Sequence, residues 1–155
     1  VEPEGKNVRC TKIGGTTDIS AGQLIDRTGQ MLGLPFPAGK HLDALAGESG
    51  DLFKVKCPGL EFSLSGVQNK VQQYSESHSP AETAAYCLNS VCFAVKKATE
   101  NALAQYKGLE VVLSGGVASN SRLRAAMEPL HAVFGAPQYS TDNAMGVAIL
   151  ANRLK

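Results

Sequence analysis

This 155-residue chain has few of the side chains that would indicate a self-contained metal centre or a disulfide framework. Its four cysteines form no Cys-x-x-Cys pair, and a disulfide framework does not fit a chain of this size and composition. The three histidines, His41, His78 and His131, are scattered, so no two of them stand at the helical spacing that binds a metal. Packing or surface roles are the expected ones for both residue types.

Charge of one sign and long apolar runs are also missing. The formal net charge is +1, which excludes a general basic field for nucleic acid, so any RNA contact would need a local patch or a partner. No segment approaches the length of a membrane span, and the N-terminus lacks a signal-peptide pattern. We therefore expect a cytoplasmic protein without a membrane partner. The length and the 43% hydrophobic content suit one domain of ordinary size.

One strand-turn-helix segment carries the strongest local signal. Residues 111–113 are β-branched and aliphatic, which predicts a short buried strand, and Gly115 and Gly116 break it. Ser119 or Asn120 is then placed to cap a helix. Such a unit presents free backbone N–H groups to a phosphate or nucleoside, and glycine leaves room for the approach. The alternative is an ordinary βα connection, since the segment matches neither common phosphate-binding glycine motif.

Strand and helix patterns alternate along the rest of the chain, which predicts an α/β domain with a β-sheet flanked by helices. Residues 79–82 give the strongest helix start, a capping box with proline at the first helical position. The first helix contains Gly22 and Gly29, which indicate either close packing or ligand approach, or else a weak helix held by its surroundings. Residues 1–13 look like an extended segment with a polar turn at residues 3–5 and one short strand that has no obvious partner. Helices are expected over residues 18–32, 41–46, 67–74, 79–106 and 143–154.

Several separated motifs occur along the chain in an order that is typical of one protein family. They are residues 21–27 (Ala-Gly-Gln-Leu-Ile-Asp-Arg), 32–39 (Leu-Gly-Leu-Pro-Phe-Pro-Ala-Gly), 62–66 (Phe-Ser-Leu-Ser-Gly), 114–120 (Ser-Gly-Gly-Val-Ala-Ser-Asn) with 122–124 (Arg-Leu-Arg), and 141–143 (Thr-Asp-Asn). Together they resemble the tRNA N6-threonylcarbamoyladenosine synthase (threonylcarbamoyltransferase) family, formerly called O-sialoglycoprotein endopeptidase or glycoprotease. The resemblance implies an α/β actin-like ATPase lobe of RNase H-like type. It makes residues 18–155 the C-terminal lobe and residues 1–17 a remnant strand region of the upstream lobe.

The family transfers a threonylcarbamoyl group from its adenylate to the N6 amine of a tRNA adenosine. The resemblance places a nucleotide, ATP or threonylcarbamoyl-adenylate, against six residues: Asp26, Gly39, Asp43, Gly115, Gly116 and Asn120. Two of them, Asp26 and Asp43, would accept hydrogen bonds from nucleotide hydroxyls. Without the resemblance, both carboxylates would read as surface or capping residues, and Asn120 as a simple helix cap.

A metal site is only partly encoded in this chain. The resemblance makes Asp142 one ligand of a divalent metal, iron or zinc, although Asp142 is equally placed to cap the last helix. The family supplies two further ligands from a His-x-x-x-His helix and a phosphate-side Ser-Gly-Gly-His-Thr loop, and this sequence contains neither motif. One carboxylate is not a metal site. We therefore assign no catalytic residue and expect the chain alone to be inactive.

The sequence departs from the family pattern within the motifs themselves. Gln23 and Arg27 stand where the family usually has Glu and Lys, Ile19 where it has a second Asp, and Lys40 where it has Pro. These departures favour a diverged paralogue. Three interpretations stay open: the lobe of a transferase that acts on tRNA when complete, a catalytically silent nucleotide-binding or scaffold paralogue that pairs with an active protein, and another phosphotransferase of the superfamily. The abrupt start inside a strand favours a domain cut from a longer protein over a natural half that pairs with another chain. A peptidase is disfavoured because no zinc-protease motif is present.

Overall fold

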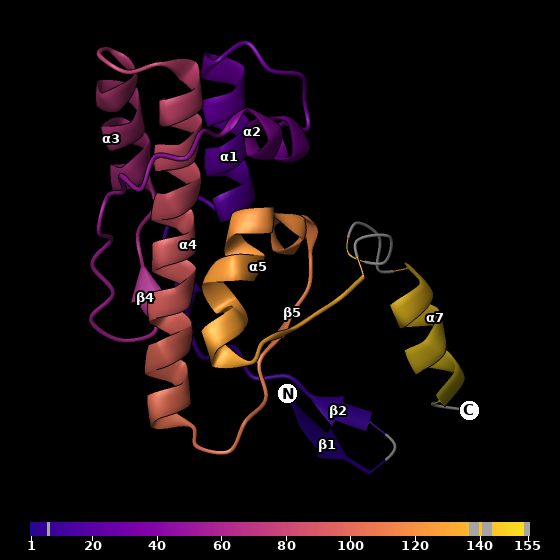
Figure 1. The fold of residues 1–155 in the computed structure, drawn as a ribbon. Coiled ribbons are helices and arrows are strands. Elements are labelled where there is room, and N and C mark those ends of the chain that lie inside the picture. The colour runs from indigo at the N-terminus through magenta and orange to yellow at the C-terminus, as the bar shows by residue number, and fades with distance from the viewer. Residues whose placement is uncertain (6, 137–139, 141–143, 154–155) are drawn as a thin grey trace.

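The structure is a computed structural model that describes residues 1–5, 7–136, 140 and 144–153. Most of its helices pack against one long central helix, and the C-terminal helix lies apart from it (Figure 1). The helices are α1 (Ala21–Met31), α2 (Gly39–Leu45), α3 (Ser65–Ser75), α4 (Pro80–Gln105), α5 (Ser121–Met127) and α7 (Ala144–Arg153), with short 3-10 turns at Gly116–Ser119 and Glu128–Leu130. The strands are β1 (Glu2–Glu4), β2 (Asn7–Arg9), β3 (Gly15–Thr16), β4 (Glu61–Phe62), β5 (Val112–Leu113) and β6 (Val133–Phe134). The expected helices are present, with ends shifted by a few residues.

Helix α4 organises the core. Its capping box is confirmed, because the Ser79 hydroxyl accepts from the Glu82 amide while the Glu82 carboxylate accepts from the Ser79 amide. Helices α1, α2 and α3 surround its N-terminal half, and α5 packs lower along it (Figure 1). The largest fully buried side chains of the core come from all of these helices: Leu24, Leu42, Val67, Val71, Leu88, Val91 and Met127. The core thus fixes α1, α2 and α5 on one scaffold.

The strands form three short pairs. Strands β3 and β4 run parallel, as do β5 and β6, and helices connect the partners in each pair. This arrangement confirms the α/β class. The expectation of a single unpaired strand at the N-terminus is wrong, since β1 and β2 form an antiparallel hairpin. The turn at Gly5, whose φ is +64°, reverses the chain there.

Close packing explains one of the two glycines in α1. A Cβ built on Gly29 would lie 2.2 Å from the Cβ of Ala38, so only glycine allows the segment before α2 to approach α1 this closely. A Cβ on Gly22 would meet nothing nearer than 3.8 Å, from Val117. The close-packing interpretation is therefore confirmed at Gly29, and Gly22 lies where the first helix faces the Gly-Gly segment.

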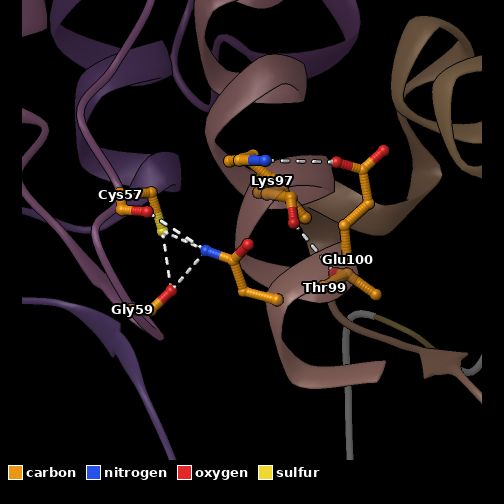
Figure 2. Close-up of polar contacts among 7 residues, drawn as sticks. Cys57, Gly59, Lys97, Thr99 and Glu100 are labelled. Atoms are coloured by element: carbon orange, nitrogen blue, oxygen red, sulfur yellow. Dashed lines mark hydrogen bonds and ion pairs between the residues drawn. The ribbon is translucent and has the colours of Figure 1, made fainter. Parts of the chain in front are cut away.

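The loop before β4 is tied to the C-terminal half of α4 (Figure 2). The Asn101 amide donates to the carbonyls of Cys57, at 3.1 Å, and Gly59, at 2.7 Å. The Cys57 thiol also donates to the Gly59 carbonyl at 3.3 Å, which closes the loop on itself. Lys97 and Glu100, in the turn that directly precedes Asn101, form an exposed ion pair at 3.9 Å. This tie contacts none of the residues expected to bind a nucleotide.

Among the residues that the structure describes, none of the helices combines the length and the apolar character needed to span a membrane.

Candidate functional site

A cleft of about 430 Å³ opens between α1, α2 and the segment that precedes α5. Its lining includes Asp26, Gly39, Asp43, Gly116 and Asn120, which come from three separate stretches of the chain. Gly115 is not part of the lining, although it directly precedes Gly116. The structure therefore brings five of the six residues expected to bind a nucleotide to one place. Their role as nucleotide ligands stays a prediction.

Asp43 joins the two sides of the cleft. Its Oδ1 accepts from the Asn120 amide and from the Ser121 hydroxyl, both at 2.9 Å, and its Oδ2 accepts from the Ser121 backbone N–H at 2.9 Å. Asn120 is buried and also caps α5, because its Oδ1 accepts from the Leu123 N–H at 3.0 Å. The capping interpretation of Asn120 is confirmed, and the same side chain lines the cleft.

Asp26 holds the segment that leads into α2. Its Oδ1 accepts from the Ala38 backbone N–H at 2.8 Å. Within the described ranges, its Oδ2 has no hydrogen-bond donor from the protein. Because a carboxylate oxygen can accept two hydrogen bonds, Asp26 keeps acceptor capacity in the cleft. The close contact between Gly29 and Ala38 keeps the Ala38 amide next to this carboxylate.

The Gly-Gly turn has two different glycines. Gly115 adopts a φ of +98°, a backbone conformation that favours glycine, and it starts the 3-10 turn that leads to Asn120. A Cβ on Gly116 would meet no atom within 4 Å, and one on Gly39 would meet only the Ile25 side chain at 4.0 Å. These two glycines therefore face open space, where a ligand can approach the backbone.

Apolar side chains complete the cleft, and sequence reasoning missed them. Ile25, Pro37 and Val117 lie in its lining, each next to a residue or motif that was identified for its polarity or its glycine. Ser121, which supplies two of the three donors to Asp43, was missed as well. A mixed surface of a few apolar side chains with converging polar groups is typical of small-molecule sites.

The buried thiols are unsuited to nucleophilic catalysis. Burial raises the pKa of Cys87 to about 12, and burial likewise raises the pKa of Cys92 to about 12. Because their pKa values are this high, both thiols stay protonated at neutral pH. The thiolate is the reactive form, so neither side chain is an effective nucleophile. A packing role for both, as expected from the sequence, agrees with their burial in the core.

No cluster of three or more His, Cys, Asp or Glu side chains suitable for a metal occurs in residues 1–5, 7–136, 140 and 144–153. Asp142, the one metal ligand expected from the sequence, lies outside the described residues. The described residues thus supply no metal centre of their own.

The fold is of the actin-like ATPase class. A solved structure of full-length HypF, described as a phosphate- and nucleotide-bound form, matches the chain with a TM-score of 0.72 at 20% sequence identity. The match covers 87% of this chain and 20% of that chain, and at this identity it shows the fold alone. The sequence is more specific. The family described as tRNA N6-adenosine threonylcarbamoyltransferase matches residues 5–149, and the chain belongs to that family.

Individual members of the family resemble the chain over most of its length. The tRNA N6-adenosine threonylcarbamoyltransferase of Chloroherpeton thalassium is 33% identical, over 94% of this chain and 49% of its own length. The protein of the same name from Carboxydothermus hydrogenoformans is 34% identical, over 88% of this chain and 45% of its own length. The Streptococcus suis protein is 32% identical, over 90% of this chain and 46% of its own length. The chain therefore spans about half the length of the curated relatives it matches.

Proposed function

We propose that this chain forms one wall of a nucleotide-binding cleft in a tRNA threonylcarbamoyltransferase. The ligand is an adenine nucleotide, either ATP or threonylcarbamoyl-adenylate. One observation carries the proposal: Asp26, Asp43 and Asn120 are far apart in the sequence but line a single cleft together with Gly39 and Gly116. Membership of the family supplies the reaction class, transfer of the threonylcarbamoyl group to a tRNA adenosine.

The chemistry of the lining supports a nucleoside as the bound part. Asp26 retains a free oxygen for a ribose hydroxyl, and Oδ2 of Asp43 accepts only one hydrogen bond from the described residues. The apolar side chains of Ile25, Pro37 and Val117 suit the faces of an aromatic base. The backbone at Gly39 and Gly116 is open to close approach. The described residues thus suit binding and orientation of the ligand, and no group among them is placed to act as a nucleophile.

The metal that the resemblance implies would be held by Asp142, which lies outside the described residues, together with a His pair that this sequence does not contain. The proposal assigns the remaining ligands and the transfer step to a second half, on the same or another polypeptide. The chain alone is then expected to bind a nucleotide without turning over threonylcarbamoyl-adenylate.

The two departures within the α1 motif are compatible with binding. The Gln23 side chain accepts from the Ser20 amide at 2.9 Å and completes the capping box of α1. The Arg27 guanidinium donates to the Gln68 side chain at 2.8 Å. Both side chains therefore have structural roles, which also suits the second candidate function, a silent nucleotide-binding paralogue that pairs with an active protein.

Titration calorimetry with AMP and ATP tests the proposal on the 155-residue protein. We expect saturable binding, weakened about tenfold or more by Asp26→Ala, since a hydrogen bond to a charged group contributes about 1.5–3 kcal/mol. Glu100→Gln is the matched control, because Glu100 is an exposed carboxylate on α4 that pairs with Lys97. Absence of binding, or equal affinity of the Asp26→Ala variant, would reject the nucleotide cleft. Turnover by the chain alone would reject only its dependence on a second half.

A further inference from the structure

Helices α2 and α5 are joined by reciprocal hydrogen bonds, in which a charged side chain of each helix bonds to the end of the other. Asp43 belongs to α2 and accepts hydrogen bonds at the start of α5, from Asn120 and Ser121. Arg122 belongs to α5 and donates in the opposite direction, to the carbonyls of Ala46, at 3.4 Å, and Gly47. Ala46 is the residue that ends α2. A carboxylate therefore lies at a helix N-terminus and a guanidinium at a helix C-terminus, the favourable placement for each charge.

Asn89 connects these reciprocal hydrogen bonds to the central helix α4. The Arg122 guanidinium donates to the Asn89 side-chain oxygen at 3.0 Å. The amide of the same asparagine donates to the carbonyls of Ser49, at 2.8 Å, and Asp51, at 3.0 Å. The segment after α2 is thus held at several carbonyls by two side chains. Arginine suits this position because its planar guanidinium presents several donors in fixed directions, which lysine cannot reproduce.

The reciprocal hydrogen bonds lie close in the sequence to two residues that line the cleft. Asp43 stands three residues before Ala46, and Asn120 stands two residues before Arg122. A shift of the α2 C-terminus relative to α5 would therefore move Asp43 away from Asn120 and Ser121. Both helices pack on α4, where Asn89 is located. The guanidinium and the Asn89 amide thus hold together two segments that line the same cleft.

We propose that Arg122 and Asn89 are positioning residues that hold Asp43 and Asn120 in the arrangement required for nucleotide binding. This inference rests on the proposed function for its effect on affinity. It also makes a claim about the protein without ligand: the hydrogen bonds from Ser121 to Asp43 persist because Arg122 and Asn89 hold α2 against α5.

The chain contains its own matched control for this proposal. Asn101 is on the same helix as Asn89, twelve residues further along, which is about 18 Å along the helix axis. Like Asn89, it uses its amide to donate to two loop carbonyls, those of Cys57 and Gly59 (Figure 2). Replacing either asparagine by alanine therefore removes the same kind of tie. Only the Asn89 tie is connected to the cleft.

The experiment compares Asn89→Ala, Arg122→Lys and Asn101→Ala in the 155-residue protein, with Tm, the Kd for AMP and amide hydrogen exchange measured for each. We expect Asn89→Ala and Arg122→Lys to raise the Kd about five- to tenfold, and Asn101→Ala to change it less than twofold at a similar loss of Tm. Exchange of the Ser121 amide should accelerate at least tenfold in the first two variants only.

The two readouts separate this inference from the proposed function. If the unaltered protein does not bind AMP, the nucleotide proposal fails, while the exchange rate of Ser121 still decides whether the two residues hold Asp43 in place. Unchanged Ser121 exchange in both Asn89→Ala and Arg122→Lys would overturn the inference. Equal weakening of AMP binding by Asn101→Ala would also overturn it, because the effect would then follow general loss of stability.

Discussion

Asp18 and Asp43 perform the same local task in two regions of the molecule, with different surroundings. Each carboxylate accepts hydrogen bonds at the N-terminus of a helix that is distant in the sequence. Asp18 accepts from the Leu64 amide at 2.8 Å and from groups of Ser63 and Ser65 at the start of α3. Asp43 accepts from Ser121 and Asn120 at the start of α5.

The difference lies in what remains free on each carboxylate. Asp18 has four donors, the Ser63 and Ser65 hydroxyls and the Leu64 and Ser65 amides, which fill its usual capacity of about four lone-pair sites. Asp43 has three donors, and its Oδ2 receives one of them. Asp43 also lines the cleft, whereas Asp18 does not. A saturated carboxylate can only hold the fold together, while an unsaturated one can also take a ligand.

The largest expected effect is on stability at Asp18. Asp18→Ala removes the acceptor for the α3 N-terminus, and we expect the free energy of unfolding to fall by about 2 kcal/mol, the upper end for a helix cap. Asp43→Ala should cost about 1 kcal/mol, because Asn120 continues to cap α5. Urea unfolding of both variants measures the difference. A larger loss for Asp43→Ala than for Asp18→Ala would contradict the distinction between the two carboxylates.

The next largest effect is on ligand binding, where the substitution at Asp43 should have a larger effect than the one at Asp18. Asp43→Asn keeps the size of the side chain but removes its charge, and we expect the Kd for AMP to rise about tenfold, which corresponds to about 1.4 kcal/mol. Asp18→Asn should leave the Kd within twofold, because Asp18 has no place in the cleft lining. Calorimetry at 25 °C on both variants checks this, and equal Kd changes would remove the functional meaning of the comparison.

Sequence reasoning predicted what local patterns and the family motifs encode. The capping box at Ser79 and Glu82 predicted α4 almost to its ends, because a cap and an apolar stripe are properties of a short segment. The family resemblance predicted five residues of the cleft lining, including Asp26 and Asn120, but not its apolar side chains. Glycine patterning at Gly29 indicated close packing without indicating that Ala38 is the residue in contact.

The remaining features depend on which segments meet in space. Ser121 carries no signal in the sequence, and Arg122 stands there only as part of a family motif without an assigned role. Their contacts arise because α5 begins beside the end of α2. The saturation of Asp18 arises from residues more than forty positions away. The hairpin of β1 and β2 was missed because three-residue strands carry too little alternation to reveal a partner. Such contacts have no local signature.

The smallest expected effect is the pH dependence that Asp18 adds to stability. Burial on its own would raise the pKa of Asp18, but the hydrogen bonds from Ser63, Ser65 and the Leu64 amide outweigh it and hold the pKa far below the ordinary value of 3.8. Because the pKa is lower in the folded protein than in the unfolded chain, the contribution is complete at neutral pH and declines as the pH falls below about 4.

Asp18→Asn cannot lose a proton, so the stability difference between the unaltered protein and this variant should be constant from pH 7 to pH 5 and shrink below pH 4. Urea unfolding at several pH values measures it, and subtraction removes the contribution of Glu82, whose pKa is also lowered by its hydrogen bonds with Ser79. A difference that stayed constant down to pH 3 would mean that the donors around Asp18 do not depend on its charge. The hydrogen bonds to Asp18 would then depend on the shape of its side chain alone. The charge of the carboxylate would no longer enter the comparison of Asp18 with Asp43.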